Sequence, residues 1–239
     1  MNSTNPSNAA LSDTPKSPLL SLLPDAYLAS VLQKCSTKKY FRHQFIVRES
    51  ERNNNLFIIN TGRVRVTLFS MSGKEVSFVD MCAGENFGEI SAIDGGPRSA
   101  SVMALEDTEI TVMPGSLLQT MLLDQPQVAL QLLKQMASIV RRLCNRIFEY
   151  STLGARNRIH SELLRLAREN LDLDGKARIH SPPTHSEIAS RVSCHREAVS
   201  REMKLLENQG VIEKRTKKLI VPDCKLLETL VLSVGGRID

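Results

Sequence analysis

No stretch of about 18 consecutive apolar residues occurs in this sequence, so nothing in it resembles a membrane-spanning helix. Residues 1–18 are rich in Ser, Asn, Thr and Pro and lack the basic start and apolar run of a secretion signal. These absences predict a globular cytoplasmic protein without a membrane partner. They also predict that residues 1–18 form a disordered tail.

Cysteine pairs with the spacing of metal ligands are also missing. The chain has five, and no two have the Cys-x-x-Cys spacing that is typical of zinc or iron–sulfur ligands. They are Cys35, Cys82, Cys144, Cys194 and Cys224. No Ser-His-Asp or Cys-His arrangement with supporting motifs occurs either. We therefore expect buried free thiols, no metal and no enzymatic activity.

What is present is a chain of 239 residues, long enough for two modest domains, with a net charge of +5. The positive excess is uneven. From Ala155 onward there are 16 Lys and Arg against 12 Asp and Glu, so most of it lies in the C-terminal third. That third is the electrostatic candidate for binding nucleic acid.

Residues 40–113 contain short apolar runs separated by turn residues. The runs at 45–47, 56–59, 64–68 and 76–79 alternate with Asn-rich and Gly-containing breaks. Runs at a spacing of roughly 8–12 residues predict an antiparallel barrel or sandwich.

The pattern becomes helical from 125 to about 150. Apolar residues there alternate in steps of four and three over about three heptads, which is typical of a coiled coil. The predicted seam consists of Ala129, Leu133, Met136, Val140, Leu143, Ile147 and Tyr150. The alternative, a helix packed only on its own domain, needs a wider apolar stripe. We expect one flank to pack on the barrel and the seam, from Leu133 to Tyr150, to form a homodimer.

Asp-Gly and Pro-Pro breakers predict a loop at 172–183. A helix-turn-helix is predicted after it, near the C-terminus. Thr184 and Glu187 fit a capping box at the start of one helix, and a second helix runs from about 195 to Gly210. Its exposed N-terminal face presents His195, Arg196, Glu197, Ser200 and Arg201. A basic segment follows at 214–218, between two apolar runs that predict a hairpin, and includes Lys217 and Lys218. Together with Thr184, these lysines are expected to contact DNA.

Arginine at the start of such a second helix can pair with guanine in the major groove, and glutamate can accept from cytosine. The alternative is a solvated helix face with intrahelical ion pairs. Clustering of the charges at the exposed start of the second helix favours DNA recognition. Ser193 stands in the turn where glycine is usual.

With these segments in order, the chain from about residue 20 resembles the Crp/Fnr family of bacterial transcription regulators. The resemblance rests on the barrel strands, the segment 84–90 with Pro97-Arg98-Ser99-Ala100, the long helix and the helix-turn-helix. It implies an α+β protein with a cyclic-nucleotide-binding β-roll (jelly-roll-like) at 19–124. A dimerisation helix at 125–153 and a winged helix-turn-helix at 154–239 complete the implied organisation.

The cassette at 84–100 also makes physical sense by itself. Glycines at 84 and 88 let backbone N–H groups approach an anion, and the planar guanidinium of Arg98 suits a cyclic phosphate. By resemblance, the ribose-phosphate site is lined by Gly88, Glu89, Ile90, Arg98, Ser99 and Ala100. The alternative is that Glu89 and Arg98 only pair with each other near a turn.

One departure concerns the base. Cyclic-AMP-sensing members of the family contact the adenine through a Thr-Ser pair, and the matching positions here are Leu143 and Cys144. Leucine cannot hydrogen-bond a base, and cysteine does so only weakly. Cyclic AMP is the first choice of effector, with cyclic GMP or cyclic di-GMP as the alternative.

The resemblance also names partners. Arg196, Glu197 and Arg201 match the reading residues of the cyclic-AMP-sensing members. They imply double-stranded DNA with two-fold-related TGTGA-like half-sites, and RNA polymerase as a partner if the protein is an activator. The remaining alternative is a nucleotide-binding regulatory module that acts on a protein partner, against which the helix-turn-helix speaks.

Overall fold

The computed structural model describes residues 17–71, 75–233 and 235. The chain separates into two compact units, Met1–Leu68 with Phe78–Ala137 and Phe69–Ser77 with Ser138–Asp239. The expected tail lies outside the described residues up to residue 16. Ser17 is already buried, and its Oγ accepts a hydrogen bond from the Leu19 backbone N–H at 3.3 Å. Ser17 thus belongs to the packed structure and not to the predicted tail.

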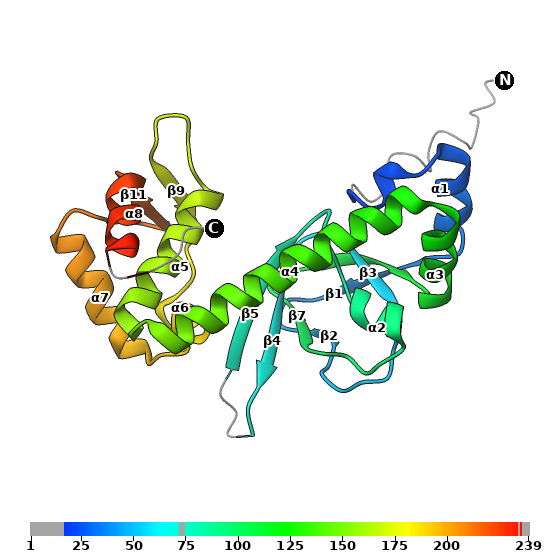
Figure 1. Ribbon diagram of the computed structural model, residues 1–239, viewed down its shortest axis with the longest axis horizontal. Helices are drawn as coiled ribbons and strands as arrows, with labels where there is room; N and C mark the ends of the chain where they lie inside the picture. Colours follow the sequence, from blue (N-terminus) through cyan, green and yellow to red (C-terminus); the bar gives the residue numbers. More distant parts are fainter. Residues whose placement is uncertain (1–16, 72–74, 234, 236–239) are drawn as a thin grey trace. The chain divides into compact units, whose positions relative to one another are not determined.

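The first unit is built from short strands and helices (Figure 1). In chain order they are the 3-10 helix Leu20–Leu22, α1 (Asp25–Leu32), β1 (Ser36–Tyr40), β2 (Phe45–Val47), β3 (Leu56–Thr61), β4 (Arg63–Phe69), β5 (Glu75–Cys82), β6 (Asn86–Phe87), α2 (Glu89–Asp94), β7 (Ser101–Ala104), β8 (Thr108–Met113) and α3 (Gly115–Asp124). The strands form two four-stranded sheets, ordered β1-β8-β3-β6 and β2-β7-β4-β5. β8 pairs antiparallel with β1 and β3, and β7 pairs antiparallel with β2 and β4.

The two sheets pack face to face around an apolar core. It contains residues from both sheets, namely Val47, Phe57, Ile59, Val64, Phe87, Val102, Ile110 and Val112. β3 lies between two cores, and its successive side chains point alternately into one and the other. Phe57 and Ile59 enter this core, whereas Leu56 and Ile58 enter a second one under the helices. This arrangement is the predicted β-roll.

A single helix, α4 (Pro126–Thr152), follows α3. Its first turns belong to the first unit, where Val128 and Leu132 join the core beneath the helices. Its residues from Ser138 onward belong to the second unit. It is the longest element in the described part of the chain.

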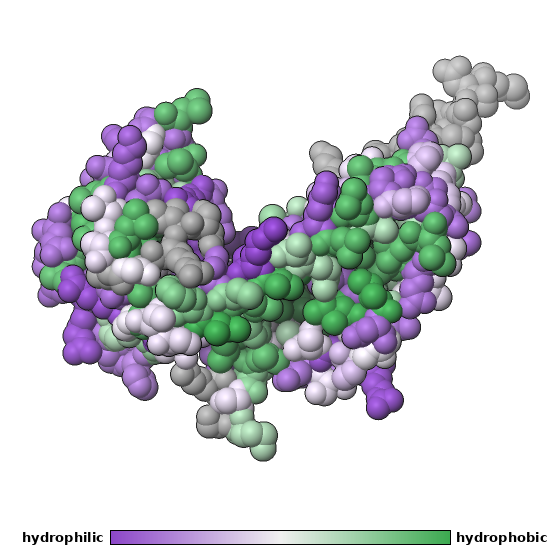
Figure 2. Space-filling model, viewed as in Figure 1, coloured by the Kyte–Doolittle hydropathy of each residue, from purple (hydrophilic) through white to green (hydrophobic). Residues whose placement is uncertain are grey.

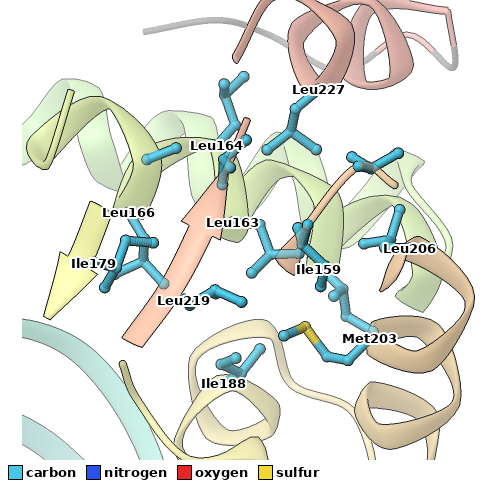
Figure 3. Close-up of a cluster of buried hydrophobic side chains, with 14 of the residues drawn as sticks. Ile159, Leu163, Leu164, Leu166, Ile179, Ile188, Met203, Leu206, Leu219 and Leu227 are labelled. Carbon is cyan, nitrogen blue, oxygen red and sulfur yellow. The ribbon is translucent and has the colours of Figure 1, made fainter. Parts of the chain in front are cut away.

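The second unit contains α5 (Ala155–Glu169), β9 (Ala177–His180), α6 (His185–Val192), α7 (Arg196–Asn208), β10 (Glu213–Arg215), β11 (Lys218–Val221) and α8 (Cys224–Leu232). Its helices and its small sheet share one apolar core. Figure 3 labels side chains of this core, namely Ile159, Leu163, Leu164, Leu166, Ile179, Ile188, Met203, Leu206, Leu219 and Leu227. The unit therefore has a core of its own, and the α+β class with a winged helix-turn-helix is confirmed.

One sequence-based expectation is wrong in this unit. The segment 172–183 reads as a loop in the sequence, but Ala177–His180 forms β9. β9 pairs antiparallel with β11, with Ile179 opposite Leu219. The sheet order is thus β10-β11-β9, and the wing is the outer hairpin of a three-stranded sheet.

The cysteines also depart from expectation. All five are free thiols, but only Cys224 is buried, while Cys82 and Cys144 are exposed. Burial raises the pKa of the Cys35 thiol to about 11. Among the described residues, no group of three or more His, Cys, Asp or Glu side chains is placed to hold a metal ion. Within the same ranges, no helix is long and apolar enough to cross a membrane.

Candidate functional site

The cassette between β6 and β7 depends on a glycine. Gly88 precedes the short helix α2 and has a φ of +84°, a conformation that side chains with a Cβ rarely adopt. A Cβ at this position would lie 2.4 Å from Nη1 of Arg98. Glycine is therefore required here both by the backbone conformation and by the approach of the arginine.

The side chain of Arg98 lies inside the cassette, and the residue has 3% of its surface exposed. Its Nη1 donates to the Gly88 carbonyl at 3.0 Å, and its Nη2 donates to Asn55 O at 2.7 Å and to Asn53 Oδ1 at 3.1 Å. Its carbon Cζ stands 5.0 Å from the ring centre of Phe57. The arginine thus ties the segment before β3 to the start of α2.

The electrostatics of the cassette combine burial with nearby carboxylates. Burial lowers the pKa of Arg98 from its usual value, while the charges of Glu89 and Glu51 oppose that shift. Nε of Arg98 is buried and donates no hydrogen bond, and the buried Oε2 atom of Glu89 accepts none. Buried polar atoms of this kind usually find a partner in the functional state.

The structure brings Gly88, Glu89 and Arg98 together. Ser99 is exposed, and Ile90 and Ala100 are half-buried beside them. The hydrogen bonds of Arg98 run to the loop before β3, a connection that the sequence did not indicate. An anion at this place would meet a planar donor with its Nε–H still available, and it would compete with Asn53 and Asn55 for the others.

The predicted seam on α4 is an exposed apolar stripe in the single chain, and Figure 2 shows apolar side chains gathered along this helix. The exposed seam residues are Leu133 (65%), Val140 (55%), Leu143 (42%), Ile147 (65%) and Tyr150 (38%). Met136 is half-buried, and Cys144 beside Leu143 is exposed. Exposed apolar stripes of this length are typical of protein–protein interfaces. Leu143 and Cys144 belong to the second unit, whereas the cassette belongs to the first.

The helix-turn-helix begins with the predicted capping box, which the structure confirms. Oγ1 of Thr184 accepts from the Glu187 N–H at 3.3 Å, and the carboxylate of Glu187 accepts from the Thr184 N–H at 2.7 Å. Ser193 ends α6 with φ +49° and ψ +54°, so it takes the left-handed conformation for which glycine is usual. The turn is therefore retained despite the serine.

α7 presents its charges to the outside. Arg196, Glu197 and Arg201 are exposed, and His195 is the exposed residue that precedes the helix. The opposite face is buried through Val199, Met203 and Leu206. The structure thus places three of the predicted base-reading residues on one open face of a helix whose back is fixed in the core.

Ser200 differs from these three because a neighbour engages it. Its Oγ lies 2.8 Å from Nδ1 of His185, the first residue of α6. Burial lowers the pKa of His185, and the positive charges of Lys214 and Arg196 lower it further. His185 thus lies among the candidate DNA-binding residues, although the sequence pattern did not single it out. Its place beside Thr184 in the capping box was the available signal.

The wing is basic around its turn, at residues 214–218. β10 and β11 are joined through Thr216 and Lys217, with Arg215 opposite Lys218. Lys217 has a φ of +58° at this turn. Lys217 and Lys218 are both exposed, as are the other residues of 214–218. Exposed lysines on a protruding hairpin can contact DNA phosphates without reading sequence.

A buried ion cluster behind the helix-turn-helix was not expected from the sequence. Glu162 on α5 is 3% exposed and pairs with Arg146 at 3.1 Å, with Arg191 at 3.1 Å, and with Arg165. Arg165 also pairs with the buried Glu149. Burial by itself would raise the pKa of Glu162, but the three arginines outweigh it and hold that pKa below its usual value.

Comparisons with known proteins identify both domains. A cyclic nucleotide-binding domain model matches residues 37–125, and a Crp-like helix-turn-helix domain model matches residues 157–230. The Cyclic AMP receptor protein of Thermus thermophilus is 31% identical over 193 residues, which are 80% of this chain and 85% of the relative. A CRP-like cAMP-activated global transcriptional regulator of Mycobacterium tuberculosis is 26% identical over 84% of this chain and 90% of its own.

A solved structure shows that the fold is shared. The c-di-GMP-responsive global regulator CLP of Xanthomonas campestris matches with a TM-score of 0.70 and 18% identity, over 83% of this chain and 99% of its own. A nucleotide-binding β-roll and a winged helix-turn-helix therefore occur here in the order found in known regulators. This chain is a DNA-binding transcription regulator with a cyclic nucleotide-binding domain, not an enzyme, and it belongs to the Crp/Fnr family.

Proposed function

We propose that this protein is a homodimeric, cytoplasmic transcription regulator that cyclic AMP controls. Each β-roll binds one nucleotide through its cassette, and the two helix-turn-helix motifs bind a palindromic DNA site. RNA polymerase is the further partner where the protein acts as an activator. The observation that carries the effector part is the buried guanidinium of Arg98, whose Nε donates no hydrogen bond although it lies beside Gly88 and Glu89.

The phosphate end of the site supports a cyclic nucleotide. A buried, permanently charged guanidinium costs free energy unless an anion or hydrogen-bond acceptors surround it. Here Arg98 has three acceptors from the chain, and a cyclic phosphate would supply further ones, including one for Nε. Glu89 would accept a hydrogen bond from a ribose 2′-hydroxyl. Ser99, exposed next to Arg98, is a further donor for the phosphate.

Cyclic AMP is the first choice because the relatives from Thermus and Mycobacterium carry cyclic AMP in their names. The base end is the weak point, since Leu143 and Cys144 offer a base little hydrogen bonding. Calorimetric titration of the full chain with cyclic AMP, cyclic GMP and cyclic di-GMP tests this choice. We expect cyclic AMP to bind most tightly. If another nucleotide binds most tightly, that nucleotide is the effector and not cyclic AMP. If none of the three binds, the proposed control by a nucleotide is wrong.

The homodimer is proposed from the stripe on α4. Five large apolar side chains are exposed along it, and pairing of two copies would remove them from water. Val140→Glu places two like charges near the two-fold axis, which should shift sedimentation from dimer toward monomer. Arg142→Glu, at an exposed position outside the seam, is the matched control. An unaltered dimer in Val140→Glu would place the interface elsewhere.

The DNA site is proposed from α7. Arg196 and Arg201 would each address a guanine, and Glu197 a cytosine on the opposite strand, in a TGTGA-like half-site. Two recognition helices of a dimer lie about one DNA turn apart, so half-site centres should be about 10–11 base pairs apart. Selection from random-sequence DNA tests this directly. Recovery of an unrelated or non-palindromic sequence would contradict the readout but not the fold.

A further inference from the structure

The last turn of α6 has an unusual set of hydrogen-bond partners. The final carbonyls of a helix have no donor within the helix itself, and water or neighbouring groups usually satisfy them. Here three successive carbonyls, those of Arg191, Val192 and Ser193, accept from side chains of other helices. The carbonyls lie at the turn that leads directly into α7.

Two of the donors come from α4. Nη1 of Arg146 donates to the Arg191 carbonyl at 2.8 Å, and the hydroxyl of Tyr150 donates to the same oxygen at 2.7 Å. These two donors occupy both lone pairs of a carbonyl whose residue is buried. Arg146 also pairs with Glu162 on α5 at 3.1 Å, so its guanidinium is held on two sides.

The third donor comes from α5. Arg158 donates to the Val192 carbonyl at 2.9 Å through Nε and to the Ser193 carbonyl at 3.2 Å through Nη2. The same guanidinium donates to Leu153 O in the connection between α4 and α5, and it lies 5.6 Å from the ring centre of Tyr150. Cations near a helix C-terminus also interact favourably with the helix dipole.

We propose that Arg146 and Tyr150 are positioning residues for DNA recognition. By holding the Arg191 carbonyl, they fix the end of α6, and with it the turn at Ser193 that sets the direction of α7. This role goes beyond the proposed function, because it depends neither on the identity of the nucleotide nor on the sequence of the half-site. It gives the C-terminal turns of α4 a part in DNA readout besides the apolar seam.

The chemistry of the shared acceptor determines the expected pattern. Removing one donor leaves the Arg191 carbonyl with the other, whereas removing both leaves a buried acceptor unsatisfied. Tyr150→Phe deletes only the hydroxyl and keeps the ring on the seam and beside Arg158. Arg146→Met deletes the other donor at similar side-chain length, and Arg146→Lys restores a positive donor.

The test measures the affinity of the full chain for two duplexes of equal length. One is the sequence that the unaltered protein selects from random DNA, and the other is its scrambled version. We expect the ratio of the two affinities to fall about threefold in each single variant and about tenfold or more in Tyr150→Phe with Arg146→Met. Arg146→Lys should retain more of the ratio than Arg146→Met.

The ratio separates positioning from general instability, because a smaller folded fraction weakens binding to both duplexes equally. Thr152→Ala is the matched control, since its hydroxyl donates only to Phe148 O of the same helix. Hydrogen exchange of the peptide 191–199 supplies a second readout, and it should speed up in the double variant. An unchanged ratio together with unchanged exchange in the double variant would overturn the proposal.

Discussion

The cassette and α7 both contain arginine, but the arginine of the cassette is buried and those of α7 are exposed. Arg98 is buried and donates three hydrogen bonds within its own unit. Arg196 and Arg201 are exposed, and neither side chain makes a hydrogen bond or an ion pair within the described part of the chain. Arg98 would meet a ligand first through its Nε–H, and its other N–H groups could bind that ligand only by leaving their present acceptors. The other two arginines would meet DNA directly.

This difference in burial indicates which of the two regions can rearrange when a ligand binds. A ligand that draws Arg98 away from Asn53 Oδ1 and Asn55 O changes the contacts of the loop before β3, so binding and rearrangement are coupled. Asn54 in that loop touches α3, because a Cβ on Gly115 would lie 2.2 Å from the Asn54 carbonyl oxygen. Exposed arginines on a fixed helix report nothing in this way. In the proposed function they would supply affinity and sequence preference.

The largest expected effect tests the buried arginine. Arg98→Leu should weaken nucleotide binding by about 2–5 kcal/mol, because the phosphate loses a desolvated charged partner. It should also lower the stability of the first unit by about 1–3 kcal/mol, since the Gly88 and Asn55 carbonyls lose their donor. Calorimetry and thermal unfolding measure the two effects.

Arg63→Leu is the control for this variant, because that arginine lies on the same barrel in an exposed pair with Glu106. We expect it to leave both measurements nearly unchanged. If Arg98→Leu binds the nucleotide as well as the unaltered protein does, Arg98 is a structural residue only, and the contrast with α7 loses its functional meaning.

The next effect tests the exposed arginines. Arg201→Ala should cost about 1–3 kcal/mol in specific DNA binding and relax the preference at one base pair. The stability of the second unit should hardly change, because the side chain makes no hydrogen bond or ion pair with the described residues. Competition binding against single-base variants of the site measures the preference. Asn208→Ala, at the far end of α7, is the control, and an equal loss of preference there would refute the assignment.

A smaller effect distinguishes the role of the wing in DNA binding from that of α7. Lys218→Gln should weaken binding to all DNA sequences alike, because an exposed lysine on the hairpin would contact phosphates and not bases. The slope of log affinity against log salt should become shallower by about one for each phosphate that the protein no longer neutralises. Affinities measured at several salt concentrations give the slope. A change in base preference would instead place the wing in a groove.

The smallest effect concerns pH. The pKa of His185 is lowered by burial and then by Lys214 and Arg196, so folding favours its neutral form. Its contribution to the stability of the second unit is therefore complete above about pH 6.5 and is lost as pH falls through the lowered value. His185→Gln should make thermal stability less dependent on pH below about 6.5. An unchanged pH dependence in His185→Gln would contradict this assignment.

Local rules predicted much of the fold. The capping box at Thr184 is a contact across three residues, and the strands of the β-roll follow from short apolar runs between turn residues. β9 was missed because Ala177–His180 is short, lies near Asp-Gly and Pro-Pro breakers, and depends on pairing with β11. A partner about 40 residues away leaves no mark on so short a strand.

The site shows the same limit. The sequence predicted that Gly88 and Arg98 lie together, but two of the three hydrogen-bond acceptors of Arg98 lie 43 and 45 residues before it in the chain. Tyr150 fitted the heptad pattern, and periodicity carries no information about the direction of its hydroxyl. Its bond to the Arg191 carbonyl arises from the packing of α4 against α6, which only a three-dimensional structure supplies.

The buried ion cluster around Glu162 bears on where a DNA-binding fragment of this chain should begin. A DNA-binding fragment that began at Ala155 would keep the apolar core of the second unit but lose Arg146, Glu149 and Tyr150. Glu162 would then face two arginines in place of three, and Arg165 would lose one of its two carboxylates. Removing one partner from a buried ion pair commonly costs about 3–5 kcal/mol. The transferable module for a chimaeric regulator therefore starts near Ser138, inside α4, and a fusion joint belongs there.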